Sequence, residues 1–420
     1  MMKDRIYMCV DLKSFYASVE CVERGLDPFK TNLIVADPER TRGTICLAAT
    51  PAIKALGVKS RCRVFEIPQN IEYIMAPPRM ALYVDYSARV YSVYLKYAAR
   101  EDIHIYSIDE VFIDVTDYLS YRGQTPREFA LMVLGDILST LGLTATCGIG
   151  TNLYLAKIAL DIISKRADDC IGILDEDSYR RLLWDHRPLT DFWRIGRGTE
   201  TRLERMGILT MREVAHAEES FLYRAFGIDA ELLIDHAWGR ETATMADIKA
   251  YVPESRSLSS GQVLPRNYEY GEGRVIVREM AEALALDMFG QGLVTNSINL
   301  SLGYSYASPR KPVHGSVSTG AHSCSVKKLA DCAVLLYDRI MDRSAPIRRL
   351  TVAFGDLRED GFQQYDLFSE PAAQERERGL QTAMLDIKRK YGKNGLVKCM
   401  DLLEGATMME RNRQIGGHRA

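Results

Sequence analysis

The segment His-Ile-Tyr-Ser-Ile-Asp-Glu-Val-Phe-Ile-Asp at residues 104–114 decides the fold of this chain. Apolar and polar residues alternate along it, as they do in a strand with one buried face. Asp109 and Glu110 interrupt the alternation near its middle, where acidic residues fit the bend between two strands. The pattern predicts a β-hairpin that carries two adjacent carboxylates at its bend.

Strand and helix patterns extend outward from this hairpin. Residues 6–10 form a short apolar run that ends at Asp11, and residues 14–22 follow with helical periodicity. A strand pattern at 144–149 leads into a helical pattern at 151–163. Strands mixed with helices in this order, and not necessarily parallel, predict an α+β fold.

The rest of the chain continues the mixture in separate blocks. Short helical patterns fill 168–240, the periodicity lapses around 243–260, and a polar tail follows residue 355. The lapse is typical of a linker between domains. The other expected elements are strands at 44–47, 296–302 and 349–354 and helices at 51–56, 79–99, 274–289, 325–341 and 380–391.

The composition is that of an ordinary globular protein, with 420 residues, 47% of them hydrophobic and 26% charged. No apolar stretch approaches the roughly 20 residues that span a bilayer, so we expect a cytoplasmic protein. The nine cysteines are scattered without a C-x-x-C pair, which argues against a disulfide framework or a zinc site. The net charge of −2 counts mildly against a nucleic-acid partner, although basic pairs cluster late in the chain at 310–311, 327–328 and 348–349.

Three carboxylates stand at the ends of predicted strands: Asp11, Asp109 and Glu110. If the strands are neighbours, the carboxylates converge and repel each other unless a cation joins them. Magnesium prefers such oxygen ligands, and two ions would suit an in-line phosphoryl displacement. From the pattern alone, the alternative is that these acids are merely solvated, as we expect for Asp114 and Asp117.

Three motifs resemble those of the Y family of translesion DNA polymerases, the UmuC/DinB-like enzymes. They are Asp-Leu-Lys-Ser-Phe-Tyr-Ala-Ser-Val-Glu at 11–20, Tyr-Ser-Ile-Asp-Glu-Val-Phe-Ile-Asp at 106–114, and Gly-Ile-Gly at 148–150 with Leu-Ala-Lys-Ile-Ala at 155–159. Any one of them could arise by chance, but all three occur in the family's order. Pro51 replaces a tyrosine that is common in relatives, which places the chain closer to the UmuC-like branch.

The resemblance implies a right-hand polymerase made of several domains. Palm and fingers would span 1–167, with the fingers at about 17–79, and a helical thumb would span 168–242. A linker at 243–250, an α+β little finger at 251–355 and a tail at 356–420 would follow.

The resemblance also implies roles for particular residues. Asp11, Asp109 and Glu110, with the Leu12 carbonyl, would be catalytic and would hold two Mg²⁺ ions. Four residues would bind the deoxynucleotide: Phe15, Tyr16 as a gate against the ribose 2′-hydroxyl, Lys54 and Lys165. The spacing before Lys165 is one residue longer than in DinB-like members, and either lysine could otherwise be an ordinary surface charge.

Two further segments are expected to bind macromolecules. Ile195, Gly196, Arg197 and Gly198 resemble the turn of a helix-hairpin-helix that holds DNA phosphates, although Arg194 departs from the motif and a plain helix-turn-helix corner would fit too. In the tail, Gln364, Leu367 and Phe368 resemble a bacterial sliding-clamp peptide, with Tyr365 in place of the usual leucine.

These features predict a template-directed DNA polymerase for damage tolerance, with primer-template DNA, deoxynucleotides and a sliding clamp as partners. A catalytically silent clamp-binding DNA protein is the alternative. Another palm-like enzyme, such as a nucleotide cyclase or a two-metal nuclease, would need neither a sugar gate nor a clamp peptide.

Overall fold

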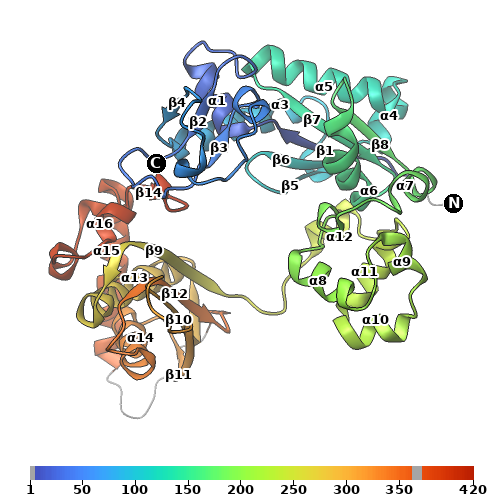
Figure 1. Cartoon of the computed structure of the whole chain (residues 1–420). Helices are drawn as coiled ribbons and strands as arrows, with labels where there is room; N and C mark the ends of the chain where they lie inside the picture. Colours follow the sequence, from blue (N-terminus) through green and yellow to red (C-terminus); the bar gives the residue numbers. More distant parts are fainter. Residues whose placement is uncertain (1–4, 362–370) are drawn as a thin grey trace. The chain divides into compact units, whose positions relative to one another are not determined.

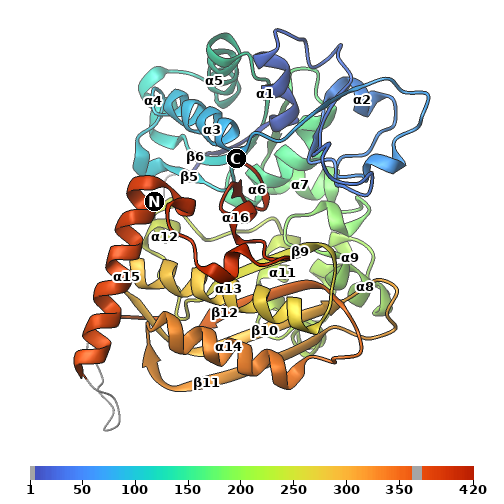
Figure 2. The same cartoon turned by 90° about the vertical axis from the view of Figure 1, so that its left-hand side faces the viewer.

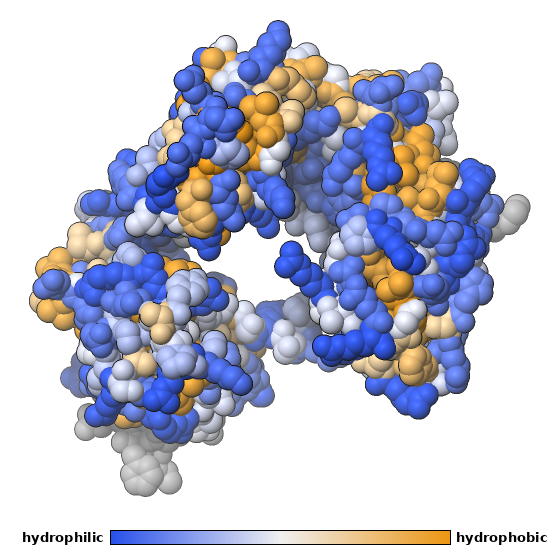
Figure 3. Space-filling view, viewed as in Figure 1, coloured by the Kyte–Doolittle hydropathy of each residue, from blue (hydrophilic) through white to orange (hydrophobic). Residues whose placement is uncertain are grey.

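The computed structural model describes residues 5–361 and 371–420 (Figure 1). The chain divides into two compact units, 1–251 and 252–419. Each unit combines a β-sheet with helices packed against it, so the predicted α+β class is confirmed. Hydrophilic residues cover most of the visible face of both units (Figure 3).

The first unit is built on a five-stranded sheet with the order β5-β6-β1-β7-β8. Strand β1 lies at the centre, antiparallel to both β6 and β7, while β7 and β8 are parallel. The mixture agrees with the expectation that the strands need not be parallel. The strands are β1 Tyr7–Leu12, β5 Ile103–Ile105, β6 Glu110–Asp114, β7 Ala145–Gly150 and β8 Ile171–Leu174.

Alternating side chains of β1 supply two different cores. Met8, Val10 and Leu12 are buried in the core that the sheet shares with helices α1, α3 and α5. Tyr7 and Cys9 point to the other face, where they pack with residues of α6. The helices are α1 Phe15–Glu23, α3 Met80–Tyr94, α4 Thr116–Arg122, α5 Pro126–Leu141 and α6 Leu153–Ile158.

Two glycines let α6 lie directly on strand β7. A Cβ atom at Gly148 would stand 2.1 Å from the carbonyl oxygen of Ala156, and one at Gly150 would stand 2.2 Å from the Ala156 nitrogen. Both neighbours are backbone atoms, which cannot rotate away. The Gly-Ile-Gly motif therefore serves the close approach of helix and strand.

Gly148→Ala should destabilise the protein by about 3 kcal/mol or more, because helix and strand must separate to admit the methyl group. Thermal unfolding measures the effect. Gly135→Ala is the matched control, since Gly135 is exposed on α5 and a Cβ there meets nothing within 4 Å. That change should stabilise by up to about 1 kcal/mol, and equal effects of the two substitutions would refute the packing argument.

Helix α6 continues into a π-helical turn at Ala159–Ile163 and then a 3₁₀ turn at Ser164–Arg166. A π-helical turn holds one residue more than an α-helical turn, because its hydrogen bonds run between residues five apart. This turn lies just before Lys165, in the stretch where the sequence predicts one residue more than in DinB-like members. Such turns often occur at functional sites.

A small three-stranded sheet with the order β3-β2-β4 forms a separate core. Its strands are β2 Leu33–Val35, β3 Ala48–Ala49 and β4 Ile74–Ala76, and helix α2 spans Pro51–Ala55. The expected strand at 44–47 is wrong: only an isolated bridge, Ile45 to Arg63, forms there. The fingers are expected to begin at about residue 17. Helix α1 packs in the core of the main sheet, and the first residue of the smaller core is Ile34.

Short helices with their own core follow strand β8. They are α7 Glu176–Leu183, α8 Arg197–Arg205, α9 Met211–His216, α10 Glu219–Phe226 and α11 Asp229–Ala237; helix α12 Met245–Ala250 follows them and packs in a different core. Helix α12 corrects the expected linker at 243–250. Thr244 caps it by accepting a hydrogen bond from the Asp247 nitrogen, and Met245 is buried against the main sheet.

The second unit contains an antiparallel sheet with the order β11-β10-β12-β9. Two long helices, α13 and α14, pack on one face of this sheet and share its core (Figure 2). The elements are β9 Leu258–Tyr268, α13 Tyr270–Gly290, β10 Leu293–Tyr304, β11 Val313–Ser323, α14 Val326–Ile340, β12 Ile347–Gly355 and β13 Arg358–Glu359.

The expected polar tail is more ordered than its composition indicates. Helix α15 spans Pro371–Tyr391, helix α16 spans Met408–Arg411, and strands β14 Gln414–Ile415 and β15 His418–Arg419 pair with each other. The amide of Gln381 donates to the Cys324 carbonyl at 2.9 Å, and the buried Glu279 of α13 accepts from the Thr407 nitrogen at 3.1 Å. These bonds attach the segment to the second unit.

Candidate active site

Asp11 and Glu110 face each other across neighbouring strands. They form one register pair of the antiparallel strands β1 and β6. Asp11 follows Tyr7 and Cys9 at intervals of two residues, and Glu110 precedes Phe112 at the same interval, so both side chains belong to the α6 face of the sheet. The register thus places two of the predicted carboxylates side by side.

Asp109 lies next to this pair in the bend between β5 and β6. Its carbonyl accepts a hydrogen bond from the Leu12 nitrogen at 3.0 Å, and its carboxylate accepts one from the Ser107 hydroxyl at 2.7 Å. The expected hairpin with acidic residues at its bend is therefore present, and it brings Asp109 to the end of β1.

The clustered charges change the protonation of Asp11. Burial, followed by the negative charges of Asp109 and Glu110, raises the pKa of Asp11 to about 7. The contribution of both charges means that the three carboxylates lie within electrostatic range of each other. The cluster is therefore one that a cation would stabilise.

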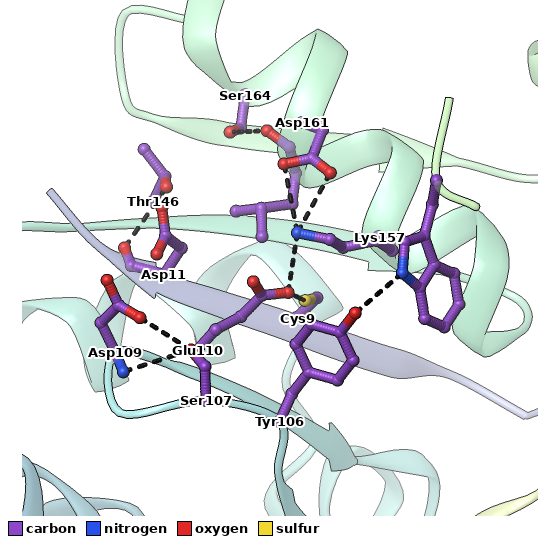
Figure 4. A network of polar contacts seen from close by, with 12 residues as sticks. Cys9, Asp11, Tyr106, Ser107, Asp109, Glu110, Thr146, Lys157, Asp161 and Ser164 are labelled. Atoms are coloured by element: carbon purple, nitrogen blue, oxygen red, sulfur yellow. Dashed lines mark hydrogen bonds and ion pairs between the residues drawn. The ribbon is translucent and has the colours of Figure 1, made fainter. Parts of the chain in front are cut away.

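Lys157 of α6 supplies one positive charge to the cluster (Figure 4). Its ammonium nitrogen lies 2.8 Å from Oε1 of Glu110 and 3.0 Å from Oδ2 of Asp161. The Cys9 thiol donates to the same Glu110 oxygen at 3.1 Å. Lys157 is 8% exposed; burial opposes its charge, but Asp161, Cys9 and Glu110 raise the pKa of Lys157 above its ordinary value.

The carboxylates of Asp11, Asp109 and Glu110 are ligands of the type that a hard cation prefers, but their side chains do not converge on one point. Within 5–361 and 371–420, no three His, Cys, Asp or Glu side chains are arranged so that they could hold a metal ion. Glu110 is turned toward Lys157, and Asp109 is bonded to Ser107 (Figure 4). Three carboxylates and a backbone carbonyl remain an all-oxygen set of the kind that Mg²⁺ prefers.

Asp11→Asn should stabilise the metal-free protein in a pH-dependent manner. The folded pKa of Asp11, about 7, exceeds its ordinary value of 3.8, so Asp11 costs stability progressively as the pH rises from 4 to 7. We expect a gain of roughly 1–3 kcal/mol at pH 8 and little at pH 4. Thermal unfolding in a chelator tests this, with the exposed Asp117→Asn as control; a gain that does not depend on pH would contradict it.

The aromatic pair of the first motif begins helix α1. Phe15 is buried, whereas Tyr16 is partly exposed, and their ring centroids lie 5.5 Å apart. Burial and the charge of Asp109 raise the pKa of Tyr16, so this ring lies within electrostatic range of the carboxylates. Ser14, just before the helix, has a φ of 50°, a left-handed conformation that turns the chain from β1 into α1.

The two predicted cationic residues reach the same site from different elements. The Lys54 ammonium, from α2, donates to the Ser14 hydroxyl at 2.7 Å. Burial lowers the pKa of Lys54. The negative charge of Asp11 raises this pKa and the positive charge of Lys165 lowers it, so both residues lie within electrostatic range of Lys54. Lys165 is exposed and lies 3.8 Å from Asp161, on the turn that follows the π-helical residues.

The predicted DNA-binding turn forms the start of helix α8. Gly196 is the residue that caps the helix, Arg197 and Gly198 begin it, and Ile195 is buried before it. The first backbone N–H groups of a helix have no partner within the helix and can bind an anion. Arg194 has a φ of 70°, which favours glycine, and its guanidinium lies over the Trp193 ring at 4.9 Å.

The segment expected to bind a sliding clamp, with Gln364, Leu367 and Phe368, lies outside the described residues. No helix in the described part of the chain is long and apolar enough to cross a membrane.

Sequence reasoning missed residues that contact the predicted site. Lys157 lies inside the third motif, and Asp161 follows it by four residues, a helical spacing that brings opposite charges together. That spacing was the available signal for the pair. The contact of Trp193 with Tyr106, whose hydroxyl accepts from the indole nitrogen at 3.1 Å, had no signal in the sequence.

Known proteins resemble this chain over nearly its whole length. Residues 10–161 match the impB/mucB/samB family, and residues 255–367 match the C-terminal domain of the same family. The chain is 30% identical over 416 residues to the "Putative UV-damage repair protein UvrX" of Bacillus subtilis strain 168, covering 98% of this chain and 97% of the relative. It is 29% identical to DNA polymerase IV 2 of the same organism, covering 100% of both chains.

A solved structure shows the same fold. A Y-family DNA polymerase chimera of Dbh and Dpo4 superposes with a TM-score of 0.66 at 20% identity, covering 83% of this chain and 98% of the chimera. The family resemblance seen in the motifs is thereby confirmed, and the closer link to the UmuC-like branch stays a prediction. The chain belongs to the Y family of translesion DNA polymerases.

Proposed function

We propose that this chain adds deoxynucleotides to the 3′ end of a primer on a DNA template, releasing pyrophosphate, and that it acts in DNA damage tolerance. The register pair of Asp11 and Glu110, with Asp109 beside it, carries the proposal. The names of the relatives support it, since one is a UV-damage repair protein and another a DNA polymerase IV. Work on chromosomal DNA agrees with the expected cytoplasmic location.

Asp11, Asp109 and Glu110, together with the Leu12 carbonyl, would hold two Mg²⁺ ions. Y-family polymerases generally depend on divalent metal ions. When bound, magnesium would offset the carboxylate charge and stabilise the charge that develops on the phosphate oxygens. The raised pKa of Asp11 supports this assignment, because burial and the charges of Asp109 and Glu110 make its ionised form costly, and a bound cation would offset that cost.

The chain's own side chains would orient the incoming nucleotide. Lys54 and Lys165 lie within electrostatic range of each other and would bind the triphosphate. The backbone of Phe15 would contact the same phosphates, and the partly exposed ring of Tyr16 would lie under the sugar. A 2′-hydroxyl would collide with this ring.

Tyr16→Ala should raise the ratio of ribonucleotide to deoxynucleotide incorporation at least tenfold, because the ring that excludes the 2′-hydroxyl is gone. An interaction worth about 1.4 kcal/mol changes a rate ratio tenfold. Single-nucleotide insertion with dATP and ATP opposite one template base measures the effect. Tyr86→Ala, which removes a buried tyrosine of α3, is the control; unchanged sugar selectivity in Tyr16→Ala would rule out the gate.

DNA would be held by the first turn of α8, at Ile195, Gly196, Arg197 and Gly198, through sequence-independent phosphate contacts. Residues 168–242 would act as the thumb and 251–355 as the little finger. A peptide at 364–368 that binds a sliding clamp would keep the enzyme on DNA.

Primer extension tests the proposal directly. The purified protein is given primer-template and each deoxynucleotide separately, then primer-template alone, and then ATP alone. We expect extension only with the nucleotide that the template specifies. Degradation of the primer or cyclisation of ATP would identify another palm-like enzyme, and a folded protein that extends nothing, even with a sliding clamp, would be a silent DNA-binding relative.

A further inference from the structure

The ring of Tyr16 lies flat against the ring of Tyr83 from helix α3. The two centroids are 4.4 Å apart and the ring planes differ by 14°. Tyr83 is fully buried, whereas Tyr16 is partly exposed. Phe15 packs against both rings, at 5.5 and 6.5 Å. Tyr16 therefore has a solid aromatic support on its buried side.

The Tyr83 ring is itself held in place at its hydroxyl group. The Tyr83 hydroxyl donates to Oε1 of Glu20 at 2.8 Å, and Glu20 is completely buried. Arg79 donates to both oxygens of this carboxylate, at 2.9 and 2.8 Å, and Arg24 also pairs with it. Burial opposes the charge of Glu20, but hydrogen bonds from Arg79, Arg24 and Tyr83 lower its pKa, so the carboxylate stays charged and keeps accepting from Tyr83.

Helical spacing explains why these four groups meet. Tyr16 and Glu20 are four residues apart on α1, so they share one face of that helix. Arg79 and Tyr83 are also four residues apart, at the start of α3. The two faces oppose each other, with ring against ring at one level and arginine against carboxylate at the next. Two helices are thus joined at the level of the Tyr16 ring.

We infer that Tyr83 is a positioning residue for sugar discrimination, held by Glu20 and Arg79. The inference rests on the proposed role of Tyr16 as the gate. A ring can exclude one additional hydroxyl only if it cannot yield, since a displacement of about 1 Å is enough to change how a reacting group fits. Stacking on a buried and hydrogen-bonded ring removes that freedom from Tyr16.

Two substitutions of Tyr83 test this. Tyr83→Met fills the space with a flexible side chain and removes the stack, whereas Tyr83→Phe keeps the ring and removes only the bond to Glu20. The readout is the ratio of kcat/KM for a deoxynucleotide to that for the matching ribonucleotide. We expect Tyr83→Met to lower the ratio roughly two- to tenfold, the range of one aromatic stack, and Tyr83→Phe to lower it less. Because the readout is a ratio of two kcat/KM values, a general loss of active protein lowers both values alike and leaves the ratio unchanged.

Tyr86→Met is the matched control. Tyr86 is also buried on α3, and its hydroxyl donates to Glu23 of α1 at 2.7 Å, but its ring packs against Arg89 instead of Tyr16. Its selectivity should equal that of the wild type. The double variant Tyr16→Ala/Tyr83→Met should be no less selective than Tyr16→Ala, because a support without a gate has no effect.

The outcomes distinguish the positioning role of Tyr83 from the gate role of Tyr16. A shift in Tyr83→Met that is absent in Tyr86→Met supports the inference, and a smaller shift in Tyr83→Phe does so even if the methionine variant fails to fold. Wild-type selectivity in both Tyr83 variants, or an equal shift in Tyr86→Met, overturns it while the gate stands. Wild-type selectivity in Tyr16→Ala would overturn the gate and the inference together.

Discussion

Replacing Asp109 and Glu110 with alanine should abolish primer extension, with a loss of about 10³-fold or more. The loss of one well-placed electrostatic group at a reacting centre already costs about 10²–10³ in rate. Asp109 lies in the bend beside the end of β1, and Glu110 begins β6 opposite Asp11, so the double substitution leaves one carboxylate of the three. Magnesium would then lack the oxygen ligands that the proposed mechanism needs. Extension of a labelled primer by single nucleotides measures the loss.

The control for this experiment is an acidic residue of the same region. Asp117→Ala changes an exposed side chain on helix α4, three residues beyond the end of β6. It should extend primers like the wild type, and thermal unfolding should show that all variants are folded. Residual extension above about a tenth of the wild-type rate by the Asp109→Ala/Glu110→Ala variant would contradict the proposed catalytic role.

Lys157→Met should destabilise the protein by about 3–5 kcal/mol, because removing one partner of a buried ion pair leaves an uncompensated charge. Lys157 pairs with Glu110 at 2.8 Å and with Asp161 at 3.0 Å, and Lys157 and Glu110 are each 8% exposed. Methionine keeps the length of the side chain, so the loss of charge dominates the effect. Chemical denaturation in a chelator measures it at pH 8.

An exposed ion pair supplies the comparison. Lys96 lies 3.0 Å from Asp136, with half of its side chain exposed, and Lys96→Met should cost no more than about 1 kcal/mol. Glu110→Gln should recover much of the stability of Lys157→Met, since it neutralises the charge left behind. If Lys157→Met were no more destabilising than Lys96→Met, the buried pair would contribute little.

The local features of the hairpin at 104–114 followed from the sequence. Alternation across 104–114 predicted the two strands and an acidic bend; the structure has Asp109 in that bend and Glu110 at the start of β6. The same reasoning failed at 243–250, where the periodicity lapses but helix α12 forms. Its six residues are too few for a period to be visible, and capping by Thr244 with burial of Met245 stabilises it instead.

Sequence patterns could not predict the contacts that hold the site residues in place. Tyr83 lies in the predicted helix at 79–99, but nothing in the chain indicated that its ring would lie on Tyr16. Lys157 carried a helical spacing to Asp161, yet its contact with Glu110 joins residues 47 positions apart. The π-helical turn before Lys165 likewise appears only as an unexplained extra residue in the sequence.

The sequence by itself determined the family and the α+β class and predicted the three site carboxylates, because periodicity and motif order are properties of short segments. The tertiary structure decided which side chains meet. Strand register brings Asp11 opposite Glu110, and helix packing brings Lys157 to Glu110 and Tyr83 to Tyr16. Register and helix packing depend on contacts between segments far apart in the chain, and the free energy of those contacts has no local signature.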